Sequence, residues 1–578
     1  MGSLTCREKI LSEDYWDFLL PDYREDPVGP FQERDGCVQE GDFGYRVSYL
    51  EQEERESLSF SRYGYYSIPK CYTPLDMDAV NAAGITAVQN FPALQTMGEG
   101  VLIGFADTGI DWRSPVFQRL DGKTRILGIW DQTAPAGDGA DSSGAAYGRM
   151  VDEAEINRML EEMGTGAGEN RYTDPGEAPG IDPDGHGSFL ASVAAGSADP
   201  ENRFIGAAPE ASIAMVKLKP AKKYLKDFYG IPQEVVCYQE NDILLGLAYL
   251  NRLAQERGMP LVLCLAMGTN FGGHNGSSVL ARVLDRYAYL TDRAVVVGAG
   301  NEAAQRHHFS HRFQKDQETV TAEIRAGEGT GGFSAEVWAR LPDVVTLSVV
   351  SPSGERTRPI SLRQEQKYDW VFTFDGTKVT VEDRILLENN DSQVIFLRFE
   401  DPAPGIWKLE LLSIQRAAGE VHIWLPVREF LRREVFFLEA DADLTMTEPG
   451  SASAVMTAAY YNGKDNGVDI HSGRGYTRNG KIKPDFAAPG VGITGLGTDG
   501  NFTVRTSSSA AAGIAAGASA LLMEWLRAQP DTLGVTSVQI RNIIVLGAGQ
   551  REFMEYPNRE WGYGTLNVYQ SLDRLRQL

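Results

Sequence analysis

Cysteine is scarce in this sequence. The 578 residues include five cysteines at widely separated positions: Cys6, Cys37, Cys71, Cys237 and Cys264. Their number is odd and no Cys-x-x-Cys pair occurs, so the pattern does not favour a zinc cluster. We expect free or buried thiols in a reducing compartment, with a disulfide in a secreted form as the alternative.

Long hydrophobic runs are also missing. The first residues, Met1-Gly2-Ser3-Leu4-Thr5-Cys6, lack the apolar core of a signal peptide. No run approaches the roughly 20 apolar residues that cross a bilayer. We therefore expect no membrane span and a cytoplasmic location, with secretion as the alternative.

Basic residues are outnumbered by acidic ones. Lysine and arginine total 55 against 79 aspartates and glutamates, which gives a net charge of −24. Because such a surface repels phosphate backbones and anionic lipids, we expect no nucleic-acid partner. Hydrophobic residues make up 42% of the chain, so a folded protein with a real core is expected.

The composition changes several times along the chain. Residues 1–75 are charged and rich in aromatic residues, which indicates a small α+β unit. Residues 76–312 alternate apolar runs such as Val101–Ala106 with helix-like stretches, which predicts an α/β domain around a parallel sheet. Residues 313–443 contain short alternating runs between turn residues, typical of a β-sandwich or jelly roll. Because the α/β pattern resumes over residues 444–578, the β module is inserted into the α/β domain.

An Asp-Thr-Gly sequence, Asp107-Thr108-Gly109, ends the first of these apolar runs. Functional groups collect beyond the carboxyl ends of strands in such sheets, and a carboxylate there can orient an imidazole. The same tripeptide also occurs in ordinary turns and in aspartic proteases. An aspartic protease needs two carboxylates that share a proton, and no second Asp-Thr-Gly or Asp-Ser-Gly occurs.

His186 lies in Asp184-Gly185-His186-Gly187-Ser188, just before small and apolar residues that predict a helix. A lone histidine is more often structural than catalytic. Here the flanking glycines let another backbone or a substrate approach the imidazole closely, which favours a functional role.

Three serines, Ser507-Ser508-Ser509, precede a run of alanine, glycine and leucine that predicts a buried helix. A serine hydroxyl at this place lies at the positive end of the helix dipole, where a developing oxyanion is stabilised. The simpler interpretation is that these serines cap a core helix.

Together these segments resemble the motifs of the subtilisin-like serine proteases, the subtilase family, with Ser188 where threonine is usual. Three further segments match in order: Gly298-Ala299-Gly300-Asn301-Glu302, Ile482–Gly490 and Gly562–Asn567. The resemblance covers about residues 76–311 and 445–578. It implies a subtilisin-like parallel sheet with flanking helices, with residues 1–75 as an N-terminal α+β prodomain.

The serine motif departs from the family's usual Gly-Thr-Ser. Counting back from Gly517-Ala518 in the predicted helix places the nucleophile at Ser509, with Ser507 at the position usually held by glycine. The alternative pair Thr506-Ser507 adds two residues to a buried helix and rotates its apolar face by about 200°. We therefore expect Ser509 as the nucleophile, and we expect Ser507 to narrow the cleft and lower activity.

The resemblance also implies roles for individual residues. Ser509 attacks the peptide carbonyl, His186 takes its proton and Asp107 orients His186, while the Asn301 side chain stabilises the oxyanion. Ala266-Met267-Gly268 forms an edge strand that pairs with an extended peptide substrate. No cofactor is expected. Calcium binding is common in the family, but the sequence offers no ligand set that can be assigned to it.

The prodomain of a subtilase assists folding and places its C-terminal tail in the cleft. The resemblance locates this tail at Tyr65–Tyr72, and we expect a self-cleaved junction between about Ile68 and Asp76. The expected partners are therefore a protein or peptide substrate and the chain's own prodomain.

Two histidines, His307 and His311, follow Asn301 at a spacing of four and could share a helix face that binds a metal. No third ligand is evident. Loop packing or hydrogen bonding is the preferred interpretation, and no metal ligand is assigned.

A short prodomain, no evident signal peptide and a β module between the asparagine and serine motifs resemble the clostridial Csp germination proteases and relatives in gut Firmicutes. That group activates the precursor of a spore-cortex hydrolase, which implies a spore-associated enzyme; a housekeeping or secreted peptidase is the alternative. The group also includes pseudoproteases that lost triad residues and act as signalling or binding proteins. A third class is a carbohydrate- or protein-binding protein that acts through the β module.

Overall fold

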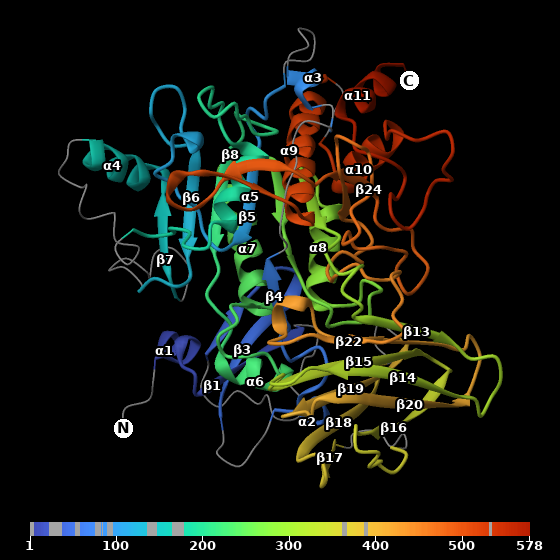
Figure 1. The fold of residues 1–578 in the computed structure, drawn as a ribbon. Coiled ribbons are helices and arrows are strands. Elements are labelled where there is room, and N and C mark those ends of the chain that lie inside the picture. The colour runs from blue at the N-terminus through green and yellow to red at the C-terminus, as the bar shows by residue number, and fades with distance from the viewer. Residues whose placement is uncertain are drawn as a thin grey trace.

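The computed structural model describes residues 5–21, 37–52, 58–74, 83, 85–89, 96–135, 147–164, 178–360, 367–386, 391–530 and 534–577. The chain forms an N-terminal unit, a central α/β domain and a β-sandwich (Figure 1). The N-terminal unit and the sandwich contact each other: the Ser61 N–H donates to Glu382, and the Tyr65 hydroxyl donates to Glu336.

An eight-stranded sheet lies at the centre of the α/β domain. Its strands run parallel except for β7, which pairs antiparallel with β6. β5 and β12 are buried throughout, as continuous apolar runs predict for strands covered on both faces. The spatial order is β24 (Phe486–Pro489), β23 (Met456–Tyr461), β12 (Arg293–Gly298), β10 (Leu261–Leu265), β5 (Leu102–Asp107), β8 (Ser212–Lys217), β6 (Ile126–Asp131) and β7 (Arg149–Asp152).

Helices cover both faces of this sheet, because successive strand residues point to opposite sides. Val262 and Cys264 pack with one set of helices, whereas Leu261 and Leu263 pack with the other. The first set is α5 (His186–Ala195), α9 (Ser508–Arg527), α10 (Ser537–Leu546) and α11 (Val568–Gln577). The second set is α7 (Glu240–Glu256) and α8 (Val279–Tyr289).

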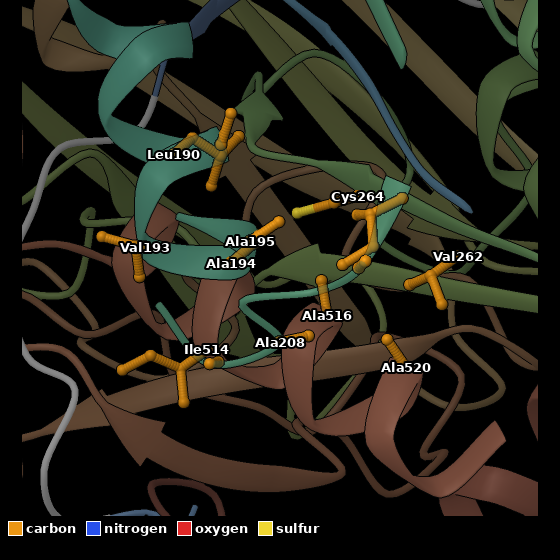
Figure 2. Close-up of a cluster of buried hydrophobic side chains, with 14 of the residues drawn as sticks. Leu190, Val193, Ala194, Ala195, Ala208, Val262, Cys264, Ile514, Ala516 and Ala520 are labelled. Atoms are coloured by element: carbon orange, nitrogen blue, oxygen red, sulfur yellow. The ribbon is translucent and has the colours of Figure 1, made fainter. Parts of the chain in front are cut away.

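α9 packs closely against α5 because glycines of α9 face that helix, and side chains of both helices belong to one apolar cluster (Figure 2). A Cβ atom on Gly517 would lie 2.4 Å from the Ala207 Cβ and 2.7 Å from the Ala194 carbonyl oxygen. By length and composition alone α9 could cross a membrane, contrary to our expectation that no such run occurs. However, 83% of its apolar window is buried inside the protein, as in a core helix.

The N-terminal unit is a small antiparallel sheet with helices beside it. α1 begins at a capping box in which Thr5 and Glu8 bond each other's backbone N–H groups. The strand order is β1-β3-β2. The elements are α1 (Cys6–Leu11), β1 (Tyr15–Pro21), β2 (Val38–Glu40), β3 (Tyr45–Glu51), α2 (Phe60–Tyr63) and, beyond it, α3 (Ile85–Gln89).

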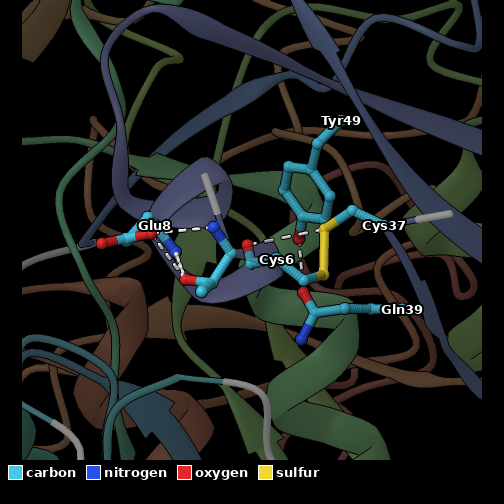
Figure 3. The surroundings of a disulfide bond; sticks show 6 residues. Cys6, Glu8, Cys37, Gln39 and Tyr49 are labelled. Carbon is cyan, nitrogen blue, oxygen red and sulfur yellow. Dashed lines mark hydrogen bonds between the residues drawn. A yellow bond between two sulfur atoms is a disulfide. The ribbon is translucent and has the colours of Figure 1, made fainter. Parts of the chain in front are cut away.

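A disulfide joins Cys6 to Cys37 within this unit (Figure 3). The expectation of five free thiols is therefore wrong for this pair. Spacing along the chain cannot give the pairing, because α1 and the strand after Cys37 meet only once the unit has folded. Cys71, Cys237 and Cys264 are free and buried.

The inserted module is a sandwich of two antiparallel sheets around its own apolar core. One sheet has the order β13-β21-β15-β19-β18-β17 and the other β16-β20-β14-β22. The strands are β13 (His308–Arg312), β14 (Thr319–Ala326), β15 (Gly332–Arg340), β16 (Val344–Val350), β17 (Lys367–Phe372), β18 (Thr377–Leu386), β19 (Ser392–Glu400), β20 (Gly405–Gln415), β21 (Glu420–Trp424) and β22 (Val435–Phe437).

The remaining elements are short and lie between these three parts. The long segment at residues 132–183 contains α4, and its residues 136–146 and 165–177 lie outside the described residues. The elements are β4 (Cys71–Pro74), α4 (Glu153–Gly164), α6 (Lys223–Tyr229), β9 (Tyr238–Gln239), β11 (Met267–Gly268), β25 (Ile493–Leu496), β26 (Phe502–Arg505), and the 3-10 turns Asp42–Gly44, Pro115–Phe117, Arg428–Phe430 and Thr498–Gly500.

Candidate active site

Asp107 is the last residue of β5, at the carboxyl end of a central strand. Its side chain is fully buried. Oδ1 accepts hydrogen bonds from the Thr108 N–H at 2.8 Å and from the Thr108 hydroxyl at 3.2 Å. These donors fix the orientation of the carboxylate.

His186 is the first residue of α5. The preceding Gly185 adopts a left-handed conformation with φ 81°, which glycine takes without steric cost. The Asp182 carboxylate accepts the Gly185 N–H at 2.9 Å and the Ser188 N–H at 2.7 Å. Asp182 therefore holds the N-terminus of the helix that carries the imidazole.

The second glycine of the histidine motif lets two backbone segments meet. A Cβ atom on Gly187 would lie 2.2 Å from the Gly109 carbonyl oxygen. The Ser188 hydroxyl accepts the Asp111 N–H at 2.9 Å. The residues around the helix start thus join the loop after Asp107 to α5.

The imidazole of His186 lies between an acid and a hydroxyl. Nδ1 is 2.7 Å from Asp107 Oδ1, and Nε2 is 3.0 Å from Ser509 Oγ. Because a carboxylate only accepts hydrogen bonds, Nδ1 carries the proton and Nε2 accepts from the Ser509 hydroxyl. The three side chains are at most 2% exposed.

The three serines at the start of α9 have different partners. Ser507 is the N-cap, and its Oγ accepts the Ser509 N–H at 2.9 Å. The Ser508 Oγ accepts the Gly300 N–H at 3.2 Å. The Ser509 hydroxyl is the one placed 3.0 Å from His186 Nε2.

Asn301 follows β12 and lies beside the same helix start. Its Oδ1 accepts the Ser508 N–H at 3.1 Å. The amide group carries two further N–H donors on the same side chain. The structure therefore brings Asn301 together with Asp107, His186 and Ser509.

The predicted substrate strand Ala266-Met267-Gly268 contains β11. In this structure β11 pairs with β4, a strand of the same chain. β4 lies between β11 and β9 in a three-stranded sheet. Gly268 pairs with Thr73 and Met267 with Pro74, antiparallel. The chain of β4 therefore runs from Thr73 through Pro74 toward Ala266, which follows the carboxyl end of β10. Asp107 lies at the same edge of the central sheet, at the carboxyl end of β5.

A buried ion pair attaches the N-terminal unit beside this small sheet. The Lys222 ammonium lies 2.5 Å from Asp17 Oδ1, and the amides of Gln239 and Asn241 donate to Asp17 Oδ2 at 3.0 and 3.2 Å. Burial lowers the pKa of Lys222, and the Asp17 charge opposes this shift. Sequence analysis did not find this network, because nothing in the local pattern links residue 17 to residues 222–241.

The histidines after Asn301 do not share a helix face, the arrangement that was considered as the alternative for them. His307 precedes β13 and lies 2.6 Å from Glu302 Oε2, whereas His311 lies within β13, 3.3 Å from Glu318. Within the described ranges no group of three His, Cys, Asp or Glu side chains is arranged to hold a metal ion.

Two acidic residues before His186 also belong to the site, and sequence analysis gave them no role. Burial raises the pKa of Asp184, while the nearby His186 lowers it. Asp182 caps the helix, as described above. An aspartate a few residues before a predicted helix start is a capping signal that would have found Asp182.

Comparisons with known proteins identify the family of this chain. The model of the Subtilase family matches residues 98–353 and 413–564. The chain therefore belongs to the subtilase family, and it is a subtilisin-like serine endopeptidase. The predicted fold class, a subtilisin-like parallel sheet with additional all-β sheets, is confirmed.

The solved structure of the CspB protease of Clostridium perfringens is similar to this chain, with a TM-score of 0.74 at 27% sequence identity. The match covers 86% of this chain and 96% of the CspB chain, which confirms the predicted likeness to the Csp group. MycP1 with its N-terminal propeptide removed matches with a TM-score of 0.38 at 14% identity, over 85% of this chain and 94% of that one. Among curated proteins no match is found.

Proposed function

We propose that Asp107, His186 and Ser509 are the catalytic triad of this endopeptidase. The observation that carries the proposal is the continuous hydrogen-bonded chain from Asp107 through His186 to Ser509. His186 Nε2 takes the hydroxyl proton as Ser509 attacks the peptide carbonyl. Asp107 stabilises the imidazolium, which then protonates the leaving amine before water releases the acyl group.

The oxyanion of the tetrahedral intermediate needs donors near Ser509. We assign this role to the Asn301 side-chain amide and the Ser509 backbone N–H. Their place at the N-terminus of α9 supports the assignment, because the helix dipole there favours negative charge. No metal or cofactor takes part in these steps.

The position of β4 supports a self-processed zymogen. β4 lies between β11 and β9 as an extended peptide substrate would, so residues 1–75 act as a prodomain whose tail fills the substrate site. The scissile bond then follows Pro74 closely, which agrees with the junction predicted between Ile68 and Asp76.

Labelling with a fluorophosphonate probe tests the triad. Wild-type protein should be labelled, Ser509→Ala should not, and Ser507→Ala should retain labelling. Labelling that persists in Ser509→Ala but vanishes in Ser507→Ala would assign the nucleophile to Ser507. Absence of labelling in the wild type would favour a pseudoprotease.

Intact-mass analysis tests the zymogen. Wild-type protein should yield two chains cut just after Pro74, and Ser509→Ala should remain a single chain. An uncut wild-type chain that is still labelled by the probe would contradict self-processing while leaving the triad intact.

The physiological role we propose is activation of another precursor protein, of the spore-germination type. Its support is the likeness to the CspB protease. Cleavage-site profiling on spore-coat and cortex protein extracts by mass spectrometry tests it. Cleavage spread over many unrelated proteins would instead indicate a general peptidase.

A further inference from the structure

Tyr72 points from β4 into a wholly buried space. Its side chain is 0% exposed and packs in one apolar cluster with Met267 and Leu280. The phenol oxygen lies 3.5 Å from Glu240 Oε1. Burial raises the pKa of Tyr72 well above its usual range, and the charges of Glu240 and Glu448 raise it further. Tyr72 is therefore a neutral hydrogen-bond donor that faces acceptors.

Glu240 also binds the backbone just before β4. Its Oε2 accepts the Lys70 N–H at 3.2 Å, and its own N–H donates to the Lys70 carbonyl at 2.9 Å. The Leu280 N–H donates to Oε1 at 3.0 Å. When the tail leaves, Glu240 keeps the bond from Leu280 and loses those from Lys70 and Tyr72.

Glu448 is a second buried carboxylate next to this tail. It is 0% exposed, and neither oxygen has a hydrogen-bond partner among the described residues. Burial raises the pKa of Glu448 to about 7. Ser451, the Lys70 charge and the Gly276 N–H each lower this pKa, although neither Ser451 nor Gly276 makes a hydrogen bond of normal geometry to the carboxylate. The charge of the tail's lysine therefore acts on Glu448.

The Lys70 ammonium is buried beside two aromatic rings of the tail. It is 0% exposed and lies 4.5 Å from the centre of the Tyr65 ring. It has no hydrogen-bond partner among the described residues, but its charge lowers the pKa of both Glu336 and Glu448. A lysine at this place therefore compensates carboxylates that belong to the rest of the enzyme.

We propose that the enzyme selects substrate segments that carry a lysine and, two residues later, a tyrosine, as Lys70 and Tyr72 do in its own tail. Glu240 and Glu448 are the specificity-determining residues. This inference rests on the proposed function, in which β4 occupies the substrate site.

The physical reason is that a buried carboxylate accepts hydrogen bonds but cannot donate them. A substrate that replaces the tail has to supply an O–H to Glu240 and an ammonium near Glu448. An apolar residue in place of the tyrosine leaves the Glu240 carboxylate without this hydrogen-bond donor, and one in place of the lysine leaves Glu448 without a nearby positive charge. Substrates with such residues should therefore be cleaved less efficiently.

Competing peptides measure this selectivity on the self-processed enzyme. The parent peptide copies residues 68–80 of the chain, and its variants replace the lysine by methionine or the tyrosine by phenylalanine. We expect kcat/KM to fall about 5- to 20-fold for each change. This range corresponds to loss of one hydrogen bond or one compensating charge.

Variants of the enzyme assign the two preferences. In Glu448→Gln the kcat/KM ratio of the lysine peptide to the methionine peptide should fall to about 1–2. The kcat/KM ratio of the tyrosine peptide to the phenylalanine peptide should stay at its wild-type value. Glu240→Gln should reduce the tyrosine preference. Asp383→Asn is the matched control, because Asp383 is a buried carboxyl bonded to Gln393 inside the sandwich. It should leave both ratios unchanged.

The pH dependence of wild-type enzyme gives a second measurement that needs no variant. The lysine preference should increase from pH 6 to pH 8 as Glu448 becomes charged, and the ratio of two peptides cancels pH effects that are common to both peptides. If the fluorophosphonate labels the enzyme but the enzyme cleaves all peptides without a preference for lysine or tyrosine, this inference is wrong and the proposed function stands. Failure of both labelling and cleavage would overturn the proposed function with it.

Discussion

The hydroxyl oxygen of Ser507 accepts the backbone N–H of Ser509 at 2.9 Å. In the mechanism proposed above, the same N–H has to donate to the oxyanion. The helix cap and the transition state therefore compete for one donor. Glycine, the usual residue of the family at this position, has no side chain with which to compete.

Replacing Ser507 by glycine should release the Ser509 N–H and raise kcat. One hydrogen bond contributes about 1 kcal/mol, so we expect an increase of about three- to tenfold. Glycine is itself a tolerated N-cap, and the loss of stability should be only a few tenths of a kcal/mol. Single-turnover acylation rates of the processed enzyme measure the effect.

The outcome of this substitution separates two roles of Ser507. A fall in kcat would mean that its hydroxyl itself donates to the oxyanion. Ser508→Ala is the companion variant, because it removes the neighbouring hydroxyl, whose partner is the Gly300 N–H. That variant should not raise kcat.

Removing the side-chain amide of Asn301 should reduce kcat by about 10²–10³ with little change in KM, as expected for loss of an oxyanion donor. Asn301→Asp is the informative partner of Asn301→Ala. It keeps an oxygen to accept the Ser508 N–H but removes the amide donor. Both variants should lose activity equally, whereas Asn301→Asp should keep the stability of the parent. Retention of kcat within tenfold in both variants would exclude the role.

Breaking the buried pair of Asp17 and Lys222 should release the N-terminal unit after self-cleavage. Asp17→Ala leaves an ammonium buried without its carboxylate, which costs about 3–5 kcal/mol. Size-exclusion chromatography of the processed protein should show the fragment separating from the rest. The double variant Asp17→Ala/Lys222→Met should recover part of the association, and the exposed Asp14→Ala should retain it. Co-elution in Asp17→Ala at micromolar concentration would contradict this expectation.

Glu448 should make the folded state less stable as the pH rises. Its pKa is about 7 in the folded protein against an ordinary value of 4.5, so the folded state binds more protons between these values. Stability is then complete below about pH 4.5 and is lost as the pH rises through about 7. In a Ser509→Ala background, which prevents self-digestion, Glu448→Gln should raise Tm relative to its parent at pH 8 and not at pH 5. The difference corresponds to on the order of 1–3 kcal/mol. If the Tm difference between the Glu448→Gln variant and its parent were the same at pH 5 and pH 8, Glu448 would not destabilise the folded state in this way.

Much of the fold was readable from local sequence. Continuous apolar runs such as Leu261–Ala266 predicted buried strands, and the strand β10 ends within one residue of that expectation. The motifs at Asp107 and His186 were readable because glycine spacing and strand ends leave a local signature. The position of Ser509 followed from helix register, since an insertion in a buried helix would misplace its apolar face.

Long-range relationships could not be read in this way. The pairing of Cys6 with Cys37 and the contact of Asp17 with Lys222 join segments whose local patterns carry no trace of each other. For His307 and His311 the spacing of four could not distinguish a shared helix face from loop packing or hydrogen bonding, because the same spacing also occurs where a strand begins. The hydrogen bond from the Ser509 N–H to the Ser507 hydroxyl depends on a cap geometry that forms only when the chain folds.

The disulfide between Cys6 and Cys37 lies wholly before β4, and the other three cysteines are free. A single cut after Pro74 would therefore leave two polypeptides with no covalent bond between them, which separate in detergent without any reducing agent. The mature enzyme would be a heterodimer that arose from one gene product. Like any heterodimer, it would lose its small subunit on dilution, so its activity would depend on protein concentration.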